Sequence, residues 1–140
     1  MQANKTVITV EAAVNAPIQK VWQCWTVPGH ITQWNHAADD WHCPHAENDL
    51  RKGGKFSYTM AAKDGSFSFD FGGVYDEVLE NELIMCTLGD GRKLKVTFAS
   101  IGDVTEVVES FEAEDENSIE LQQGGWQAIL NNFKKHTETN

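Results

Sequence analysis

The sequence predicts an α+β fold in which a curved antiparallel sheet of about six or seven strands wraps around one long C-terminal helix. The stretch from Asn117 to His136 has apolar residues at helical spacing, which predicts the helix. Most of the preceding sequence alternates apolar and polar residues with a period of two, as strands do. Asp-Gly and Gly-Asp pairs separate several of these stretches, which is typical of antiparallel hairpins.

The C-terminal helix is expected to begin at Asn117, an N-cap that forms a capping box with Glu120. Its apolar stripe comprises Ile119, Trp126, Ile129, Leu130 and Phe133. Gly124 and Gly125 interrupt the helix, and each costs about 1 kcal/mol relative to Ala. We therefore expect another backbone or a ligand to approach the helix at these glycines.

The remaining elements follow from periodicity and from turn residues. The first strand is expected at Lys5–Val14, and two short helices follow it, Ile18–Trp25 and His30–Trp34. Further strands are expected at Trp41–Ala46, Lys55–Ala62, Phe67–Leu79, Leu83–Leu88, Leu94–Phe98 and Thr105–Glu112. Gly72-Gly73 predicts a β-bulge, and Pro44 marks its strand as an edge or a bulged strand. An exposed edge there leaves homodimerisation open.

Composition narrows the class of protein. A chain of 140 residues is expected to form a single domain. The net charge of −10 argues against binding to nucleic acid or to an anionic membrane surface. No apolar run approaches the roughly 20 residues of a membrane span, and no signal peptide is visible. The 3 cysteines are too sparse for a disulfide framework and favour a reduced, cytoplasmic protein.

Four stretches, in this order along the chain, resemble one known family. They are Ala16-Pro17 with Val21-Trp22, Trp25-Thr26, Pro28, His30 and Trp34; Asn48–Arg51 with Gly53–Phe56; Gly73–Tyr75 with Glu77-Val78 and Glu82–Ile84; and Gly125-Trp126 with Leu130 and Phe133. On these stretches the chain resembles the START-like (SRPBCC) superfamily, which has the helix-grip or pollen-allergen-like fold. Within it, the chain is similar to the small bacterial members of the family named for the activator of the ninety-kilodalton heat-shock protein ATPase.

The resemblance implies that a small hydrophobic or aromatic molecule is held between the sheet and the C-terminal helix. It also leaves two other functions open: a cyclase, aromatase or hydrolase acting on a polyketide-like substrate, and a module that stimulates a chaperone ATPase. No cofactor is expected. Relatives often carry a second Trp directly after the position of Trp34, where this sequence has Asn35. Because that position lies near the expected mouth of the cavity, this difference bears on any ligand preference inferred from relatives.

A ligand cavity is expected to have a volume of at least roughly 300 Å³, and a fully packed interior without such a cavity would count heavily against ligand binding. The large side chains predicted to line it are Trp34, Trp41, Phe56, Tyr58, Phe69, Phe71, Phe98 and Trp126. Cys43, on the second strand, and Gln122, beside the helical stripe, complete the predicted ligand-binding set. Each of the aromatic residues can equally be an ordinary core residue, since aromatic stripes are common in cores.

Glu109 is the candidate polar residue of the cavity. Alternation from Thr105 places Glu109 on the same strand face as Val107 and Phe111, pointing inward beneath the helix. A buried, unpaired carboxyl is costly and its pKa rises, so Glu109 would serve as a polar anchor or a general base. If the strand twists or slips, Glu109 is solvated instead. Asp70 is expected to face solvent.

The stretch Trp41–His45 concentrates potential metal ligands. Cys43 and His45 share one strand face, and His36 is close in sequence. A metal site needs three or four converging ligands, but no second Cys/His pair lies at ligand spacing elsewhere, and His136 is far away in sequence. We therefore predict no metal site, and we expect Cys43 to be buried beside partly exposed histidines. A Cys43–His45 nucleophile pair is the alternative, although no orienting acid accompanies it.

Overall fold

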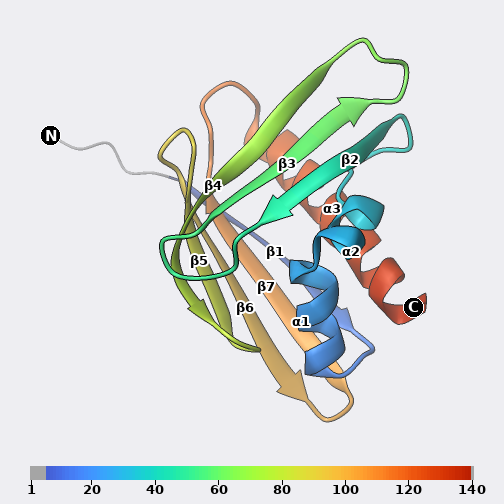
Figure 1. The fold of residues 1–140 in the computed structure, drawn as a ribbon, viewed down its shortest axis with the longest axis vertical. Coiled ribbons are helices and arrows are strands. Elements are labelled where there is room, and N and C mark those ends of the chain that lie inside the picture. The colour runs from blue at the N-terminus through green and yellow to red at the C-terminus, as the bar shows by residue number, and fades with distance from the viewer. Residues whose placement is uncertain (1–5, 140) are drawn as a thin grey trace, which may run out of the picture.

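The computed structural model describes residues 6–139 (Figure 1). In chain order the elements are β1 (Val7–Val14), α1 (Ile18–Thr26), α2 (Pro28–Trp34), β2 (Trp41–Asn48), β3 (Lys55–Ala62), β4 (Ser68–Leu79), β5 (Leu83–Leu88), β6 (Lys93–Ile101), β7 (Val104–Glu112) and α3 (Ile119–Thr139). The strands form one 7-stranded antiparallel sheet in the order β1-β7-β6-β5-β4-β3-β2. The α+β, helix-grip prediction is confirmed. Lys5, the expected start of the first strand, lies outside the described residues.

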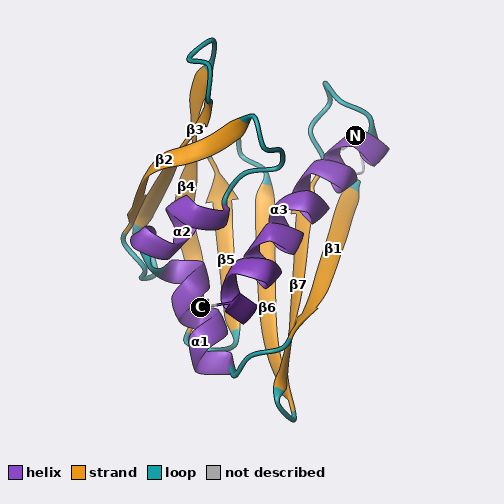
Figure 2. Cartoon of the chain, turned by 90° about the vertical axis from the view of Figure 1, so that its right-hand side faces the viewer, coloured by secondary structure: helices purple, strands orange, loops and turns teal. Residues whose placement is uncertain are grey.

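All the helices cover the same face of the sheet. Figure 2 shows α3 crossing that face at an angle, with α1 and α2 beside its C-terminal half. Phe133 of α3 joins the helices, because its ring packs edge-on against Trp25 of α1 at 4.8 Å and against Trp34 of α2 at 5.0 Å between ring centroids. The curled sheet and the helical layer therefore enclose the core between them.

Strict alternation along β7 decides which of its side chains enter this core. Thr105, Val107, Glu109 and Phe111 are all buried, whereas Glu106 between them is exposed. Since side chains alternate across a strand, one face of β7 lies beneath the helix and the other faces solvent. The inward orientation predicted for Glu109 is therefore confirmed, and the slipped register is not found.

The start of α3 differs from the prediction. The helix begins at Ile119, and the Leu121 N–H donates to the Ser118 hydroxyl at 3.1 Å, so Ser118 is the N-cap. Asn117 instead donates its N–H and its side-chain amide to the Glu114 carboxylate, at 2.6 and 3.1 Å. The capping box of Asn117 with Glu120 was wrong, because the local Asn117–Glu114 contacts form a turn before the helix. Ile119 is consequently exposed.

The glycines of α3 have open space around them. A Cβ built on Gly124 or on Gly125 would meet no atom within 4 Å outside the adjoining helix backbone. The expectation that another backbone approaches the helix at this point was wrong.

The glycines that do allow a close approach lie in β4. A Cβ on Gly72 would lie 2.3 Å from the Phe56 carbonyl oxygen, and one on Gly73 would lie 2.3 Å from that of Thr87. The bulge predicted at these glycines is instead found further along β4, where the register with β5 shifts between Tyr75 and Glu77. The glycines therefore serve to bring β4 close to both neighbouring strands.

The predicted edge at Pro44 is confirmed, since β2 ends the sheet and its pairing with β3 shifts between His42 and His45. All the cysteines are free and buried. Among the described residues, we find no helix long and apolar enough to cross a membrane.

Candidate ligand-binding pocket

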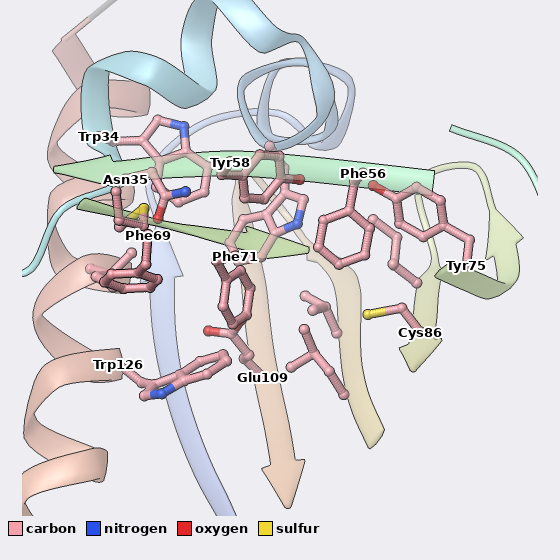
Figure 3. Close-up of a pocket in the computed structure, with 16 residues that line it drawn as sticks. Trp34, Asn35, Phe56, Tyr58, Phe69, Phe71, Tyr75, Cys86, Glu109 and Trp126 are labelled. Carbon is pink, nitrogen blue, oxygen red and sulfur yellow. The ribbon is translucent and has the colours of Figure 1, made fainter. Parts of the chain in front are cut away.

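A pocket of about 200 Å³ lies between the concave face of the sheet and the helices (Figure 3). Strands β3 to β7 supply most of its lining, while Trp25, Trp34 and Asn35 enter from α1 and the end of α2. Trp126 and Ile129 of α3 form the opposite wall. The predicted residues that line this pocket are Trp34, Phe56, Tyr58, Phe69, Phe71, Glu109 and Trp126. That any of them contacts a ligand stays a prediction.

Trp41 and Cys43 do not line the pocket. The Trp41 ring packs against Phe67 and Phe69 at centroid distances of 6.1 Å each, so it lies outside the Phe69 side chain. The buried Cys43 thiol donates to the His45 carbonyl oxygen at 3.4 Å and lies beside the Asn35 side chain. Both corrections concern β2, the edge strand, whose pairing with β3 shifts between His42 and His45.

Phe98 and Gln122 also lie elsewhere. Phe98 packs edge-on against Trp22 at 5.2 Å and Trp25 at 5.8 Å between centroids, which places it behind the lining. The Gln122 amide donates to the carbonyl oxygens of Glu114 and Asn117 at 3.2 and 2.9 Å, and its oxygen accepts from the Glu114 N–H at 2.9 Å. Gln122 therefore holds the turn before α3 and does not enter the pocket.

The volume of the pocket limits what it can hold. At about 200 Å³ it is smaller than the roughly 300 Å³ at the lower end of ordinary ligand sites, so the expected size was too large. It is still larger than an apolar cavity of about 150 Å³ that suffices to bind benzene. This volume suits a molecule with one ring or two compact rings.

The Glu109 carboxyl lies inside this apolar pocket, beside the rings of Phe71 and Trp126 in Figure 3. Glu109 is only 7% exposed, and burial raises its pKa from 4.5 to about 8. Among residues 6–139, no group forms a hydrogen bond or an ion pair with this carboxyl. Glu109 is therefore mostly protonated at neutral pH and can offer an O–H donor to a bound molecule.

The two tyrosines of the lining have already used their donors. Tyr58 donates to the hydroxyl of Tyr75, which in turn donates to the side-chain oxygen of Asn48. The Asn48 amide donates to the Thr26 carbonyl oxygen at 2.7 Å, which anchors this chain of hydrogen bonds to α1. Burial raises the pKa of both tyrosines, so both stay neutral. The remaining buried acid of the lining is the Cys86 thiol, and burial raises its pKa to about 12.

The mouth of the pocket is marked by exposed aromatic side chains. Phe69 lines the pocket although it is 45% exposed, and its ring contacts that of Phe67, which is 58% exposed, at 5.9 Å between centroids. A molecule entering from solvent would meet these rings first.

Several residues that line the pocket were not predicted from the sequence, among them Ile84, Cys86, Leu94 and Val96. Ile84 pairs directly with Val96, and Cys86 pairs with Leu94, so these four side chains form one inward patch of β5 and β6. The period-two alternation of β5 and β6 predicts the inward position of these four side chains when it is read for aliphatic residues as well as for aromatic ones.

Comparison with known proteins decides the family. The model of the family described as Activator of Hsp90 ATPase homolog 1-like protein (AHSA1) matches residues 15–138. The chain belongs to this family. The resemblance predicted from the four sequence stretches is thereby confirmed.

Solved structures of similar proteins share the fold. An AHSA1-like protein from Aeromonas hydrophila is 42% identical with a TM-score of 0.90, and the match covers 96% of this chain and 93% of that one. A protein from Cytophaga hutchinsonii is 59% identical with a TM-score of 0.82, covering 99% and 94% of the two chains. A protein from Chromobacterium violaceum, 22% identical with a TM-score of 0.86 and covering 96% and 99%, shows the fold alone. No protein with a curated functional description matches this chain.

Proposed function

We propose that this AHSA1-like protein binds one small, mostly apolar aromatic molecule in the pocket between the sheet and α3. The observation that carries the proposal is a pocket of about 200 Å³ lined by aromatic and aliphatic side chains around one buried carboxyl, Glu109. Apolar pockets with few convergent polar groups are the usual form of small-molecule sites.

The groups that face the pocket define the chemistry of the ligand. The protonated Glu109 carboxyl offers one O–H donor, whereas the donors of Tyr58 and Tyr75 are already used. The best partner for Glu109 is therefore an uncharged oxygen or ring nitrogen that accepts a hydrogen bond. The ligand is a one- or two-ring aromatic molecule with one such acceptor.

Native mass spectrometry of the protein purified from its own host tests the proposal. The wild-type spectrum should contain an added mass that corresponds to a small molecule. Asn35→Trp places an indole in the lining and should abolish this added mass. Gln33→Trp introduces the same indole on the exposed side of α2 and should retain it. A bare polypeptide mass in the wild type, or an adduct that Asn35→Trp does not affect, would contradict the proposal.

Acid–base catalysis is the second candidate function, because the pKa of about 8 for Glu109 lies close to an ordinary working pH. Once the ligand is known, Glu109→Gln separates the two functions. Loss of a chemical conversion with binding retained supports catalysis, whereas binding without any conversion by the wild type supports a carrier. Stimulation of a chaperone ATPase stays a prediction of the resemblance.

A further inference from the structure

A second cluster of chemically reactive side chains lies among the helices, away from the lining of the pocket. It comprises Cys24 of α1, His30 of α2 and His136 of α3. Their potential ligand atoms, the cysteine sulfur and one ring nitrogen from each histidine, all lie within 4.8 Å of one another. The long separation of His136 from the other two in sequence hides this cluster, and the fold brings it together.

The two histidines already converge on one point. His30 Nδ1 and His136 Nε2 are 2.9 Å apart, and the ring planes are inclined by 66° with centroids 5.1 Å apart. Two nitrogen lone pairs cannot both face each other at this distance, so one ring donates a shared proton to the other. A metal ion can replace that proton, since each imidazole nitrogen is a good ligand when neutral.

The spacing of the cluster is close to that of a tetrahedral zinc site. Zn–N bonds of about 2.0–2.1 Å and a Zn–S bond of about 2.3 Å set ligand atoms about 3.3 Å apart for two nitrogens and about 3.6 Å apart for nitrogen and sulfur. The two histidine nitrogens, 2.9 Å apart, would separate by roughly 0.4 Å. The sulfur, at most 4.8 Å from one ring nitrogen of each histidine, would move inward by at most about 1.2 Å.

The surroundings suit a metal that enters from solvent. Cys24 is buried, whereas His30 and His136 are half-buried, so the site has a closed side and an open side. The buried Thr137 hydroxyl lies beside the Cys24 sulfur and can donate to a thiolate, the kind of contact that supports metal ligands. Lys20 faces the same cluster and weakens the attraction for a cation, while the net charge of −10 on the chain strengthens it.

We propose that Cys24, His30 and His136 bind one zinc ion, with the fourth coordination position open to water. Sulfur and imidazole ligands together favour zinc over harder divalent cations such as magnesium and calcium. On binding, the Cys24 S–H bond breaks, its proton goes to solvent and a Zn–S bond forms, while the histidines bind as neutral rings. Because each ligand comes from a different helix, the ion would tie α1, α2 and α3 together beside the sheet.

Equilibrium dialysis of the full, untagged chain against zinc, followed by elemental analysis, tests the proposal. The expected result is one zinc per chain, together with a thermal unfolding midpoint that rises with zinc concentration. With cobalt(II) in place of zinc, the protein should develop the visible absorption of a tetrahedral site and a charge-transfer band from the thiolate.

Variants locate the site. His30→Gln and His136→Gln should each weaken zinc binding at least tenfold, and Cys24→Ser should also remove the thiolate band. His45→Gln and Cys43→Ser, in the Cys/His-rich strand β2, are the matched controls and should bind zinc as the wild type does. Circular dichroism without metal checks that each variant is folded. Stoichiometric binding that survives His30→Gln with His136→Gln, or an absence of stoichiometric binding by the folded wild type, would overturn the proposal.

Discussion

The indole of Trp126 on α3 lies flat against the ring of Phe111 on β7, with centroids 3.8 Å apart and planes inclined by 16°. The same indole meets Phe71 of β4 edge-on at 5.8 Å. Trp126 therefore joins the helix to two separated strands and forms one wall of the pocket. Glu109 is the next inward residue before Phe111 on β7, so this stack also fixes the position of the buried carboxyl.

Replacing Trp126 tests whether this stack holds α3 on the sheet. Trp126→Ala should reduce the free energy of unfolding by about 3 kcal/mol, the lower end for a large aromatic residue, because the indole is partly exposed. Leu121→Ala, at an exposed position of the same helix, should change it by less than about 0.5 kcal/mol. Urea unfolding measures both. Equal effects of the two substitutions would mean that Trp126 does not anchor the helix.

Glu109 should make the protein less stable as the pH rises. Its pKa is about 8 in the folded protein and near 4.5 in the unfolded chain, so between these values the folded state binds more protons. The free energy of unfolding should therefore fall by up to about 1.4 kcal/mol per pH unit through this window. It should level off above pH 8 as the folded carboxyl also ionises.

Glu109→Gln should remove this part of the pH dependence, so that its stability relative to the wild type increases from pH 5 to pH 8. Glu106→Gln is the matched control, because Glu106 lies on the same strand and faces solvent. Denaturant unfolding at several pH values provides the comparison. If wild type and Glu109→Gln show parallel curves, the carboxyl is not buried as a protonated acid.

Two glycine substitutions should have opposite effects on stability. Gly124→Ala should raise the free energy of unfolding by up to about 1 kcal/mol, because a methyl group there meets no atom within 4 Å and Ala favours the helix. Gly72→Ala should lower it by about 2 kcal/mol or more, since its Cβ would lie 2.3 Å from the Phe56 carbonyl oxygen. Thermal or urea unfolding checks both changes. Stabilisation by Gly72→Ala would show that β3 and β4 are not held this close.

The sequence predicted the fold and the central residues of the pocket because both depend on periodicity. Alternation along β7 places Glu109 beside Phe111, and helical spacing places Trp126 opposite them. The errors have other causes. Trp41 was misplaced because the register of β2 with β3 shifts between His42 and His45. The alternation of apolar and polar residues within one strand does not show how that strand pairs with its neighbour.

Features that depend on contacts between distant segments were the hardest to predict. The position of Phe98 depends on Trp22 and Trp25, which pack against it from α1. The contact of His136 with His30 depends on where α3 ends relative to α2. The sequences of these two helices do not show how the helices are placed relative to each other. The start of α3 depends on two competing local contacts. Because Asn117 donates to the Glu114 carboxylate, Ser118 caps the helix instead of Asn117.

NMR of the methyl groups during a titration with a small aromatic molecule shows whether the sheet and α3 enclose a hollow that accepts such a ligand. Quinoline, which has two apolar rings and one ring nitrogen that accepts a hydrogen bond, serves as the probe. We expect saturable shifts of the methyl signals of Ile84, Val96 and Ile129, which line the pocket, while exposed Ile101 and fully buried Val14 stay unchanged. Unchanged pocket methyls at saturating quinoline, or shifts that are as large at Ile101, would contradict this expectation.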